Sequence, residues 1–326
     1  MNVIVDREKG LLELERRIVE LRTISATHAV DMSGEIAGLE AKYAQIQHEV
    51  FGTLTAWEKV HMARHPARPT ALDYIGALNA FDELHGDRHF RDDRAIVGGL
   101  AQLGKRNVVV IGQQRGRDTK ENLQRNFGMV SPEGYRKVQR LAELAGRFHL
   151  PILTLIDTKG ADPGIGSEER SQSEAIARCL VTFSQAPVPV IATIIGEGGS
   201  GGALALAIAD CVVMLEHSVY SIASPESAAA ILWSDAAKAE AAAEHLKLTA
   251  QDLQRFGIVD RIIEEPLGGA HRDIVGTVGK VLATVGEILD TLTGKTAIEL
   301  TNGRYSKYRQ LGTLTSGRQE AAESIP

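Results

Sequence analysis

Cysteine is scarce in this sequence of 326 residues, which contains only Cys179 and Cys211. Both lie in apolar runs, and no Cys-x-x-Cys pair occurs, which excludes a zinc ribbon in this chain. Two such thiols are typical of buried, reduced side chains in a cytosolic protein. At this length a folded chain buries roughly three quarters of its extended surface, so a full core is expected without disulfides.

The sequence also lacks an excess of positive charge and any long apolar run. Lys and Arg total 36 against 42 for Asp and Glu, a net charge of −6, so no global field favours nucleic acid. The longest apolar stretch, 187–195, is too short to span a bilayer, and residues 1–10 contain no apolar run of signal-peptide length. We therefore expect a soluble, cytoplasmic protein.

Two helical stripes of apolar residues stand near the N-terminus. They are Leu11, Leu14, Ile18 and Leu21, and then Ile36, Leu39, Tyr43, Ile46 and Val50. This spacing predicts a helical hairpin over 9–50, and an arm over 1–52. Because two helices cannot bury both stripes alone, we expect the arm to pack on the core or on another subunit instead of protruding. A main domain over 53–300 and a partly disordered tail over 301–326 should follow.

Strand and helix patterns alternate from about residue 95. Strands are expected at 107–111, 151–156, 188–195, 211–215 and 219–222. Helices are expected at 134–148, 168–184, 201–209, 236–265 and 274–295. Continuous Val, Ile and Leu strands between helices predict an α/β fold with a mostly parallel sheet buried on both faces.

Five glycines crowd the segment 196–202, where the strand at 188–195 ends and a helix of small residues begins. Glycines there let a ligand oxygen approach backbone N–H groups, and a helix N-terminus favours negative charge. A tight packing turn is the structural alternative. A nucleotide loop is disfavoured, since no Lys-Ser/Thr follows the glycines and no GxGxxG stands in a dinucleotide-binding context.

A second strand ends in Asp157-Thr-Lys-Gly160-Ala-Asp-Pro-Gly164, ahead of another helix. Two such junctions at neighbouring parallel strands would direct two sets of N–H groups into one crevice, where they would stabilise an enolate oxygen. His61, His65, His85, His89, His217 and His271 show no metal-binding spacing, so we expect no metal in this chain.

These two junctions, followed by Ser-Pro-Glu226, resemble the crotonase superfamily. More closely, the chain resembles the alpha subunits of acetyl-CoA carboxylase carboxyltransferase over about residues 9–273. The shared strings include Arg64-His-Pro, Phe81-Asp-Glu-Leu-His-Gly-Asp-Arg-His-Phe90, Arg125-Asn-Phe-Gly-Met129 and Leu267-Gly-Gly-Ala-His-Arg272. The resemblance implies a crotonase/ClpP-like spiral of ββα units.

The resemblance also implies the activity and its partners. Carboxybiotin on a carrier protein would give CO2 to acetyl-CoA, forming malonyl-CoA, in an α2β2 assembly whose beta subunit carries the zinc ribbon. In this family the alpha side mainly stabilises the biotin ureido oxygen through main-chain N–H groups. The corresponding positions are Gly160, Ala161, Gly198, Gly199, Gly201 and Gly202.

Two carboxylate positions of hydratase-type crotonases can be compared with this sequence. One corresponds to Leu204, which cannot move a proton, and the other to Glu226. One carboxylate is a poor acid/base pair, but biotin itself can act as base once CO2 has left, so a carboxyltransferase needs no second one. Glu226 is therefore either catalytic or a hydrogen-bonded structural group.

Basic residues follow the strand at 107–111 and accompany the second junction. Arg115, Arg117 and Lys120 are either a solvated face or contacts to carboxybiotin, its carrier or a CoA phosphate. Lys159 and Gly164 are further candidates for contact with the cofactor.

The sequence departs from the usual family pattern beside the expected site. Lys159 replaces proline, Asp162 replaces tyrosine, Ser171 replaces glycine, and Ser227-Ala228 replaces Gly-Cys. A specialised paralogue acting on another acyl thioester is therefore an alternative. Others are a biotin-independent decarboxylase or acyltransferase with the same enolate site, and a non-catalytic scaffold subunit.

Overall fold

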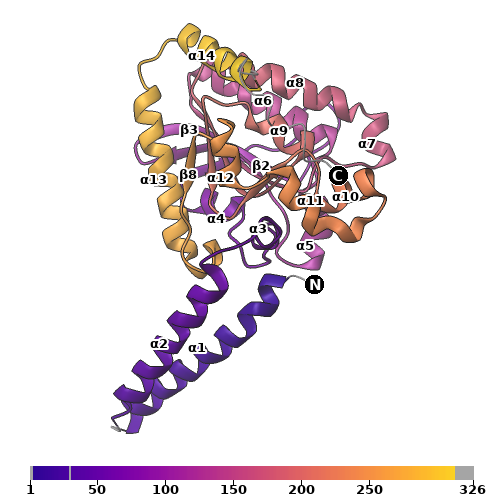
Figure 1. The fold of residues 1–326 in the computed structure, drawn as a ribbon. Coiled ribbons are helices and arrows are strands. Elements are labelled where there is room, and N and C mark those ends of the chain that lie inside the picture. Colours follow the sequence, from indigo (N-terminus) through magenta and orange to yellow (C-terminus); the bar gives the residue numbers. More distant parts are fainter. Residues whose placement is uncertain (1–2, 29–30, 313–326) are drawn as a thin grey trace.

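The computed structural model describes residues 3–28 and 31–312, and these form an α/β fold around one sheet (Figure 1). The strand order is β1-β2-β3-β4-β5-β6-β8, with β7 pairing with β5. The strands are β1 (Asn79–Glu83), β2 (Ile96–Leu103), β3 (Arg106–Gln113), β4 (Ile152–Thr158), β5 (Val190–Gly199), β6 (Cys211–Leu215), β7 (Val219–Ser221) and β8 (Arg261–Ile263). The pairs β1–β2 and β2–β3 are antiparallel, whereas the others are parallel, so the mostly parallel sheet is confirmed.

Helices cover both faces of this sheet. The main-domain helices are α3 (Ala56–Ala63), α4 (Ala71–Gly76), α5 (Thr119–Gln124), α6 (Pro132–Phe148), α7 (Ile165–Glu169), α8 (Gln172–Ser184), α9 (Ser200–Ala207), α10 (Pro225–Trp233), α11 (Ala239–Leu246), α12 (Ala250–Arg255), α13 (Ile274–Leu292) and α14 (Ala297–Gln310). One core layer packs α6, α8 and α9 on the strands, and a second packs α4 and α13 on the other side. None of the described helices is both long and apolar enough to cross a membrane.

Three strands were not predicted. β1 is a largely exposed edge strand with an Asn-Ala-Phe-Asp-Glu sequence, and β8 has only three residues inside the range 236–265 that we expected to be helical. β2 carries Gly98 in its centre, where a Cβ would lie 2.8 Å from the Leu141 side chain of α6. That glycine allows the helix to approach the sheet. Because glycine is unfavourable inside strands, it also interrupts the run of β-branched residues by which a strand is predicted.

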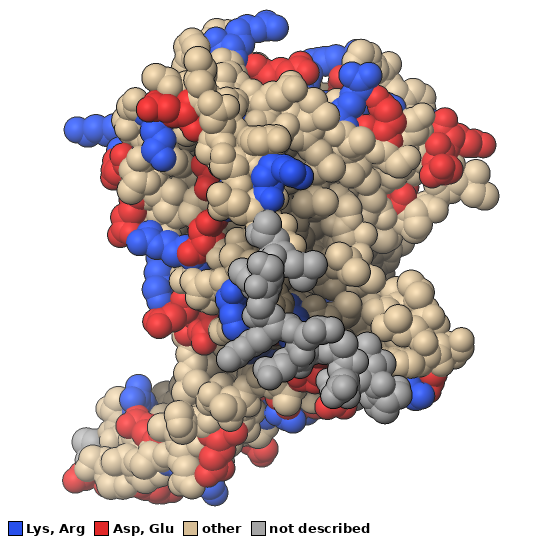
Figure 2. Space-filling view, turned by 45° about the horizontal axis from the view of Figure 1, so that its top comes forward, with Lys and Arg blue, Asp and Glu red and all other residues tan. Residues whose placement is uncertain are grey.

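The N-terminal arm consists of α1 (Val3–His28) and α2 (Ser33–Phe51), two helices side by side that project from the body (Figure 1 and Figure 2). Their stripes face each other, with Leu11, Ile18 and Leu21 buried and Tyr43 half-buried. The hairpin is confirmed. The prediction that the arm packs across the core is wrong, because only the base of the arm contacts the body. Packing of the arm on another subunit stays a prediction.

The C-terminal helix α14 crosses the boundary that we expected at residue 300. Arg304 anchors it: this side chain is buried, its Nε donates to Asp210 Oδ1 at 2.8 Å, and its Nη2 donates to the Val188 carbonyl at 2.9 Å. A charged donor that satisfies several buried acceptors holds a helix firmly. Residues 301–310 are therefore helical, while 313–326 of the expected tail lie outside the described residues.

Candidate active site at the strand–helix junctions

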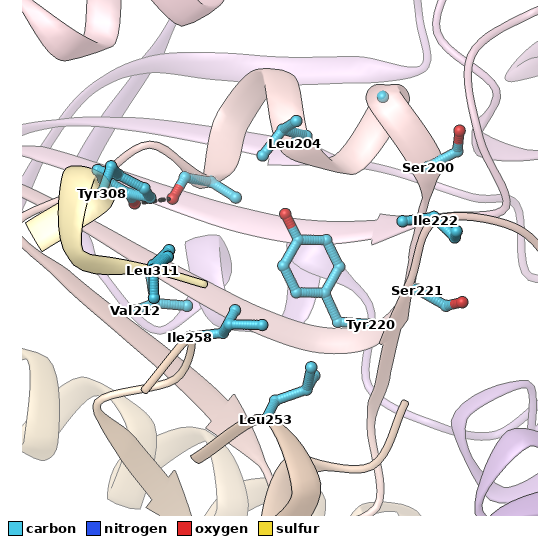
Figure 3. A pocket seen from close by; sticks show the side chains of 12 residues that line it. Ser200, Leu204, Val212, Tyr220, Ser221, Ile222, Leu253, Ile258, Tyr308 and Leu311 are labelled. Atoms are coloured by element: carbon cyan, nitrogen blue, oxygen red, sulfur yellow. Dashed lines mark hydrogen bonds between the residues drawn. The ribbon is translucent and has the colours of Figure 1, made fainter. Parts of the chain in front are cut away.

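A cavity of about 430 Å³ runs along α9, from Ser200 at the start of the helix to Ala207 at its end (Figure 3). Its walls come from α9, β6, β7, α12 and the end of α14. The lining residues are Ser200, Gly201, Leu204, Ala207, Val212, Tyr220, Ser221, Ile222, Leu253, Ile258, Tyr308 and Leu311. An apolar pocket with a few polar groups is the usual form of a small-molecule site.

The glycine segment forms no loop: residues 196–199 end the strand β5, and 200–202 begin the helix α9. β5 continues past Ile195 to Gly199, with Gly198 opposite Thr158 of β4 and Tyr220 of β7. The whole stretch 190–199 is buried. Because β7 joins the far side of β5 here, the last residues of the strand are paired on both edges.

Two of these glycines are required by close packing between the two junctions. A Cβ on Gly199 would lie 2.1 Å from the Lys159 carbonyl oxygen, and one on Gly202 would lie 2.5 Å from the Ala161 amide nitrogen. Such distances are far shorter than any real carbon contact. The packing turn that we weighed as an alternative therefore accounts for these two glycines, and their side of the junction faces protein.

Gly201 differs from its neighbours. A Cβ there would meet only the Ile176 side chain, at 3.8 Å, and Gly201 lines the cavity together with Ser200. Both residues lie in the first turn of α9, whose N–H groups have no partner within the helix, and no described side chain caps it at Gly199. Ser200 has a φ of 54°, a left-handed conformation that is costly for serine and common at functional sites. The first turn of α9 can thus receive an anionic oxygen.

The second junction contributes less than we expected. Gly160 has a φ of 152°, and its amide donates to Thr158 Oγ1 at 3.1 Å, so that N–H is already occupied. Ala161 lies against Gly202, behind the first turn of α9. The structure brings the two junctions together as predicted, but of the glycines and Ala161 that we predicted as donors only Gly201 lines the cavity.

No carboxylate or imidazole occurs among the described residues that line the cavity. Leu204 faces it and is 38% exposed, at the position where hydratase-type enzymes were expected to carry an acid (Figure 3). Tyr220 turns its ring toward α9, and burial raises the pKa of its hydroxyl well above 10. Sequence reasoning missed Tyr220 as a lining residue, although it stands in the predicted strand 219–222.

Glu226 is held in an ion-pair cluster. Arg64 Nη1 donates to Glu226 Oε1 at 2.6 Å, while Arg64 Nη2 and Nε bind both carboxylate oxygens of Glu197 at 2.6 and 3.0 Å. Burial would raise the pKa of Glu226, but the hydrogen bonds from Arg64 outweigh it and lower that pKa below 4.5. A carboxylate kept ionised in this way fits the structural alternative better than a proton donor. Arg64 and Glu197 were not predicted to matter, although Arg64 begins one of the shared strings.

The expected basic group does not form one patch. Arg115 is mostly buried, with its Nε 3.0 Å from Asp157 Oδ2 in an ion pair too bent for a hydrogen bond. Arg117 pairs with Asp73 at 2.6 Å, whereas Lys120 is exposed. Lys159 is exposed too and makes no ion pair in the described part of the chain. Arg115 therefore serves the packing of the fold through its ion pair with Asp157. Arg117 lies on the solvent-exposed face that we gave as the alternative to a ligand contact.

The unusual residues beside the second junction have local roles. Asp162 Oδ2 accepts from Ser167 Oγ at 2.6 Å and Oδ1 from the amide of Gly164 at 3.2 Å, which places the candidate Gly164 in a side-chain-capped turn. Burial opposes ionisation of Asp162, but the Ser167 hydrogen bond lowers its pKa. Ser171 precedes α8 with φ 64°, a conformation that suits glycine.

Known proteins identify the family. The family described as acetyl co-enzyme A carboxylase carboxyltransferase-like matches residues 4–312. The chain is 51% identical over 313 residues to the acetyl-coenzyme A carboxylase carboxyl transferase subunit alpha of Heliobacterium modesticaldum, covering 96% of this chain and 93% of that protein. It is 52% identical over 309 residues to the subunit of that name from Geobacillus kaustophilus, covering 94% and 95%. The chain belongs to this family.

Solved structures agree on the fold alone. A Pseudomonas malonate decarboxylase heterodimer matches with a TM-score of 0.56 at 17% identity, covering 73% of this chain and 93% of that one. The beta subunit of geranyl-CoA carboxylase from P. aeruginosa matches with a TM-score of 0.55 at 15% identity, covering 85% and 55%. The crotonase-type α/β fold expected from the sequence is thus confirmed.

Proposed function

We propose that this chain is the alpha subunit of a biotin-dependent carboxyltransferase that moves CO2 from carboxybiotin, held on a carrier protein, to acetyl-CoA, giving malonyl-CoA. The supporting observation is the cavity along α9, whose lining includes Ser200 and Gly201 of the first helical turn but no described carboxylate or imidazole. A hydratase or a hydrolase would need a proton-transferring side chain there. Family membership agrees with a transferase.

The residues suit stabilisation of an oxygen that gains negative charge. The amides of Ser200 and Gly201 would donate to the ureido oxygen of biotin, at the positive end of α9. Carboxybiotin, as substrate, would supply the CO2 and then the basic nitrogen that accepts a proton from the acetyl methyl group. Tyr220, Leu253 and Ile258 would exclude water from this step. One such donor typically contributes on the order of 3 kcal/mol to a transition state.

The site has the character of one half of an active site. Ile222 lines the cavity and is 82% exposed, and Ile231 and Leu232 at the end of α10 are exposed as well. Large exposed apolar side chains beside a cavity are typical of a surface that a partner covers. We therefore assign this face to a beta subunit with a zinc ribbon, which would hold the acyl-CoA opposite α9 in an α2β2 assembly.

The test is reconstitution with the beta subunit and a carboxylated biotin carrier. The pair should form malonyl-CoA from acetyl-CoA, and the alpha chain alone should not. An acyl-CoA panel would identify a specialised paralogue by a larger kcat/KM for another thioester. Biotin-independent loss of CO2 from malonyl-CoA would instead indicate the decarboxylase alternative. Robust transfer by the single chain would overturn the half-site assignment.

A further inference from the structure

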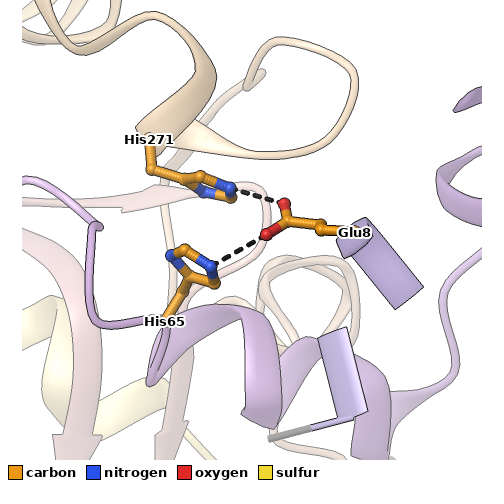
Figure 4. Close-up of side chains that lie close together, drawn as sticks. All are labelled: Glu8, His65 and His271. Atoms are coloured by element: carbon orange, nitrogen blue, oxygen red, sulfur yellow. Dashed lines mark hydrogen bonds and ion pairs between the residues drawn. The ribbon is translucent and has the colours of Figure 1, made fainter. Parts of the chain in front are cut away.

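The base of the N-terminal arm is attached to the body by a buried carboxylate between two histidines (Figure 4). Glu8 of α1 is 4% exposed; its Oε1 lies 2.6 Å from His271 Nε2 and its Oε2 lies 3.0 Å from His65 Nε2. The two imidazoles stack with their centroids 3.8 Å apart. Burial alone would raise the pKa of Glu8, but the hydrogen bonds from His271 and His65 lower it to about 2.

This trio has the composition of a metal site, since its ligand atoms lie within 4.8 Å of one another. The hydrogen bonds argue against that use. The amide of Ala67 donates to His65 Nδ1 at 3.2 Å, so Nδ1 carries no proton and Nε2 must carry it. A protonated Nε2 donates to Glu8 and has no lone pair for a metal. The Glu8 carboxylate therefore accepts one hydrogen bond from each imidazole ring. We call Glu8, His65 and His271 together the clamp.

Two connections lead from the clamp toward the candidate active site, one through His65 itself and one through its neighbour Arg64. Its carbonyl oxygen accepts from Arg115 Nη2 at 3.2 Å; Arg115 pairs with Asp157, and Asp157 Oδ1 accepts from the amide of Glu197 at 3.0 Å. Its neighbour Arg64 binds the Glu197 side chain. Glu197 is thus held by both its backbone and its side chain, three residues before Ser200.

A parallel connection runs through the body. Arg68 Nε donates to the Ile195 carbonyl at 2.7 Å, and its guanidinium pairs with Glu265 with no solvent exposure of either side chain. Glu265 Oε2 also accepts from the amide of Ala270 at 2.7 Å, next to His271. The segment 64–68 therefore lies between the clamp and the C-terminal half of β5.

We propose that Glu8 is a positioning residue: by clamping His65 and His271 it fixes the segment 64–68, and through Arg64 and Arg115 it holds the end of β5 where the first turn of α9 faces the cavity. This inference rests on the proposed carboxyl transfer. Misplacement of such donors by about 1 Å lowers a rate by up to about 100-fold. Since Glu8 does not line the cavity, its loss should lower kcat much more than it changes KM.

The experiment compares Glu8→Gln with Glu15→Gln in the full chain assembled with its beta subunit. Glu15 also ties the arm to the body, because it pairs with Arg272, and it accepts a hydrogen bond from Tyr43 within the arm, but it makes no contact with segment 64–68. Glu8→Gln places an amide N–H against an imidazole N–H. It should lower kcat about tenfold or more with KM within twofold, while Glu15→Gln stays within twofold in both. Equal losses for the two variants, or normal kcat for an assembled Glu8→Gln enzyme, would overturn the proposal.

A second pair of variants separates positioning from simple destabilisation. In His65→Gln the amide nitrogen reaches the place of Nε2 and can still donate to Glu8, whereas the shorter His65→Asn cannot. We expect His65→Gln to retain at least half of the wild-type kcat and His65→Asn to lose about tenfold, at equal assembly. Equal kcat in both would contradict the clamp. Absence of transfer by the assembled wild-type enzyme would instead overturn the proposed function.

Discussion

Gly202 lies so close to Ala161 that a Cβ on the glycine would be 2.5 Å from the alanine amide nitrogen. The junction after β4 and the junction after β5 thus touch through backbone alone. No side chain can occupy that contact without moving one junction. Gly201, one residue earlier, has open space and faces the cavity instead.

Alanine substitutions should therefore separate folding from catalysis. Gly202→Ala should destabilise the chain by about 2 kcal/mol, because overpacking a close contact typically costs 1–3 kcal/mol. Gly201→Ala should leave the unfolding free energy within about 0.5 kcal/mol but lower turnover, since its methyl group would stand at the mouth of the oxygen site. Denaturant unfolding and carboxyl transfer in the assembled enzyme measure the two effects.

Ser200→Ala is the matched control for this comparison. It removes only a hydroxyl and keeps the amide, so a main-chain site predicts a smaller loss than for Gly201→Ala. If Ser200→Ala abolishes transfer while Gly201→Ala is neutral, with both proteins assembled, the hydroxyl carries the chemistry and the amide assignment is wrong.

Ser171→Gly should stabilise the chain. Ser171 has φ 64° and ψ 60°, and a left-handed conformation costs an L-residue about 1–2 kcal/mol. The greater chain entropy of glycine offsets part of that gain, which leaves about 0.5–1 kcal/mol, visible as a higher denaturant midpoint. Ser167→Gly is the control: it removes a helical residue that bonds Asp162 and should lower stability. A lower midpoint for Ser171→Gly would contradict the strain argument.

Local patterns predicted much of this fold, whereas contacts between distant segments decided the site. The buried strands around Val109, Leu153 and Ile191 carry their signal in their own sequence. The extension of β5 to Gly199 depends on β7 pairing with it, which no local pattern contains. Likewise, Arg115 looked like a surface cation until Asp157, 42 positions away, proved to be its partner.

Glu226→Gln tests whether the one carboxylate that resembles a catalytic acid has that role. Arg64 keeps both contacts to Glu197 when Glu226 is neutral, and the Glu226 side chain is 40% exposed, so its loss is partly compensated by water. We expect kcat within about threefold of wild type. Glu197→Gln, which weakens the buried side of the same cluster, should cost more in both stability and kcat. A loss of about 100-fold in Glu226→Gln alone would indicate general acid–base catalysis.

The attachment of the arm should weaken as pH falls. Burial lowers the pKa of His271 below 6.5, although the hydrogen bond to Glu8 opposes this, so the docked state binds fewer protons than the detached state. The docking energy from His271 is thus fully present above pH 6.5 and is lost as pH falls below it. The pKa of Glu8 is lowered from 4.5 to about 2, so its contribution persists to about pH 4.5 and is lost between there and pH 2. Two steps are therefore expected, the first below pH 6.5 and the second below pH 4.5.

Hydrogen exchange of α1 at pH 7.5 and 5.5, corrected for intrinsic rates and compared with that of α13, measures the first step. Exchange in the residues around Glu8 should rise at the lower pH, while α13 stays protected. His271→Gln keeps a donor near the place of Nε2 but does not titrate, so in that variant the difference between the two pH values should vanish. An unchanged difference in His271→Gln would show that another group controls the docking. Equal protection of α1 at both pH values in the wild type would mean that His271 stays neutral when the arm is detached, or that the arm is held without it.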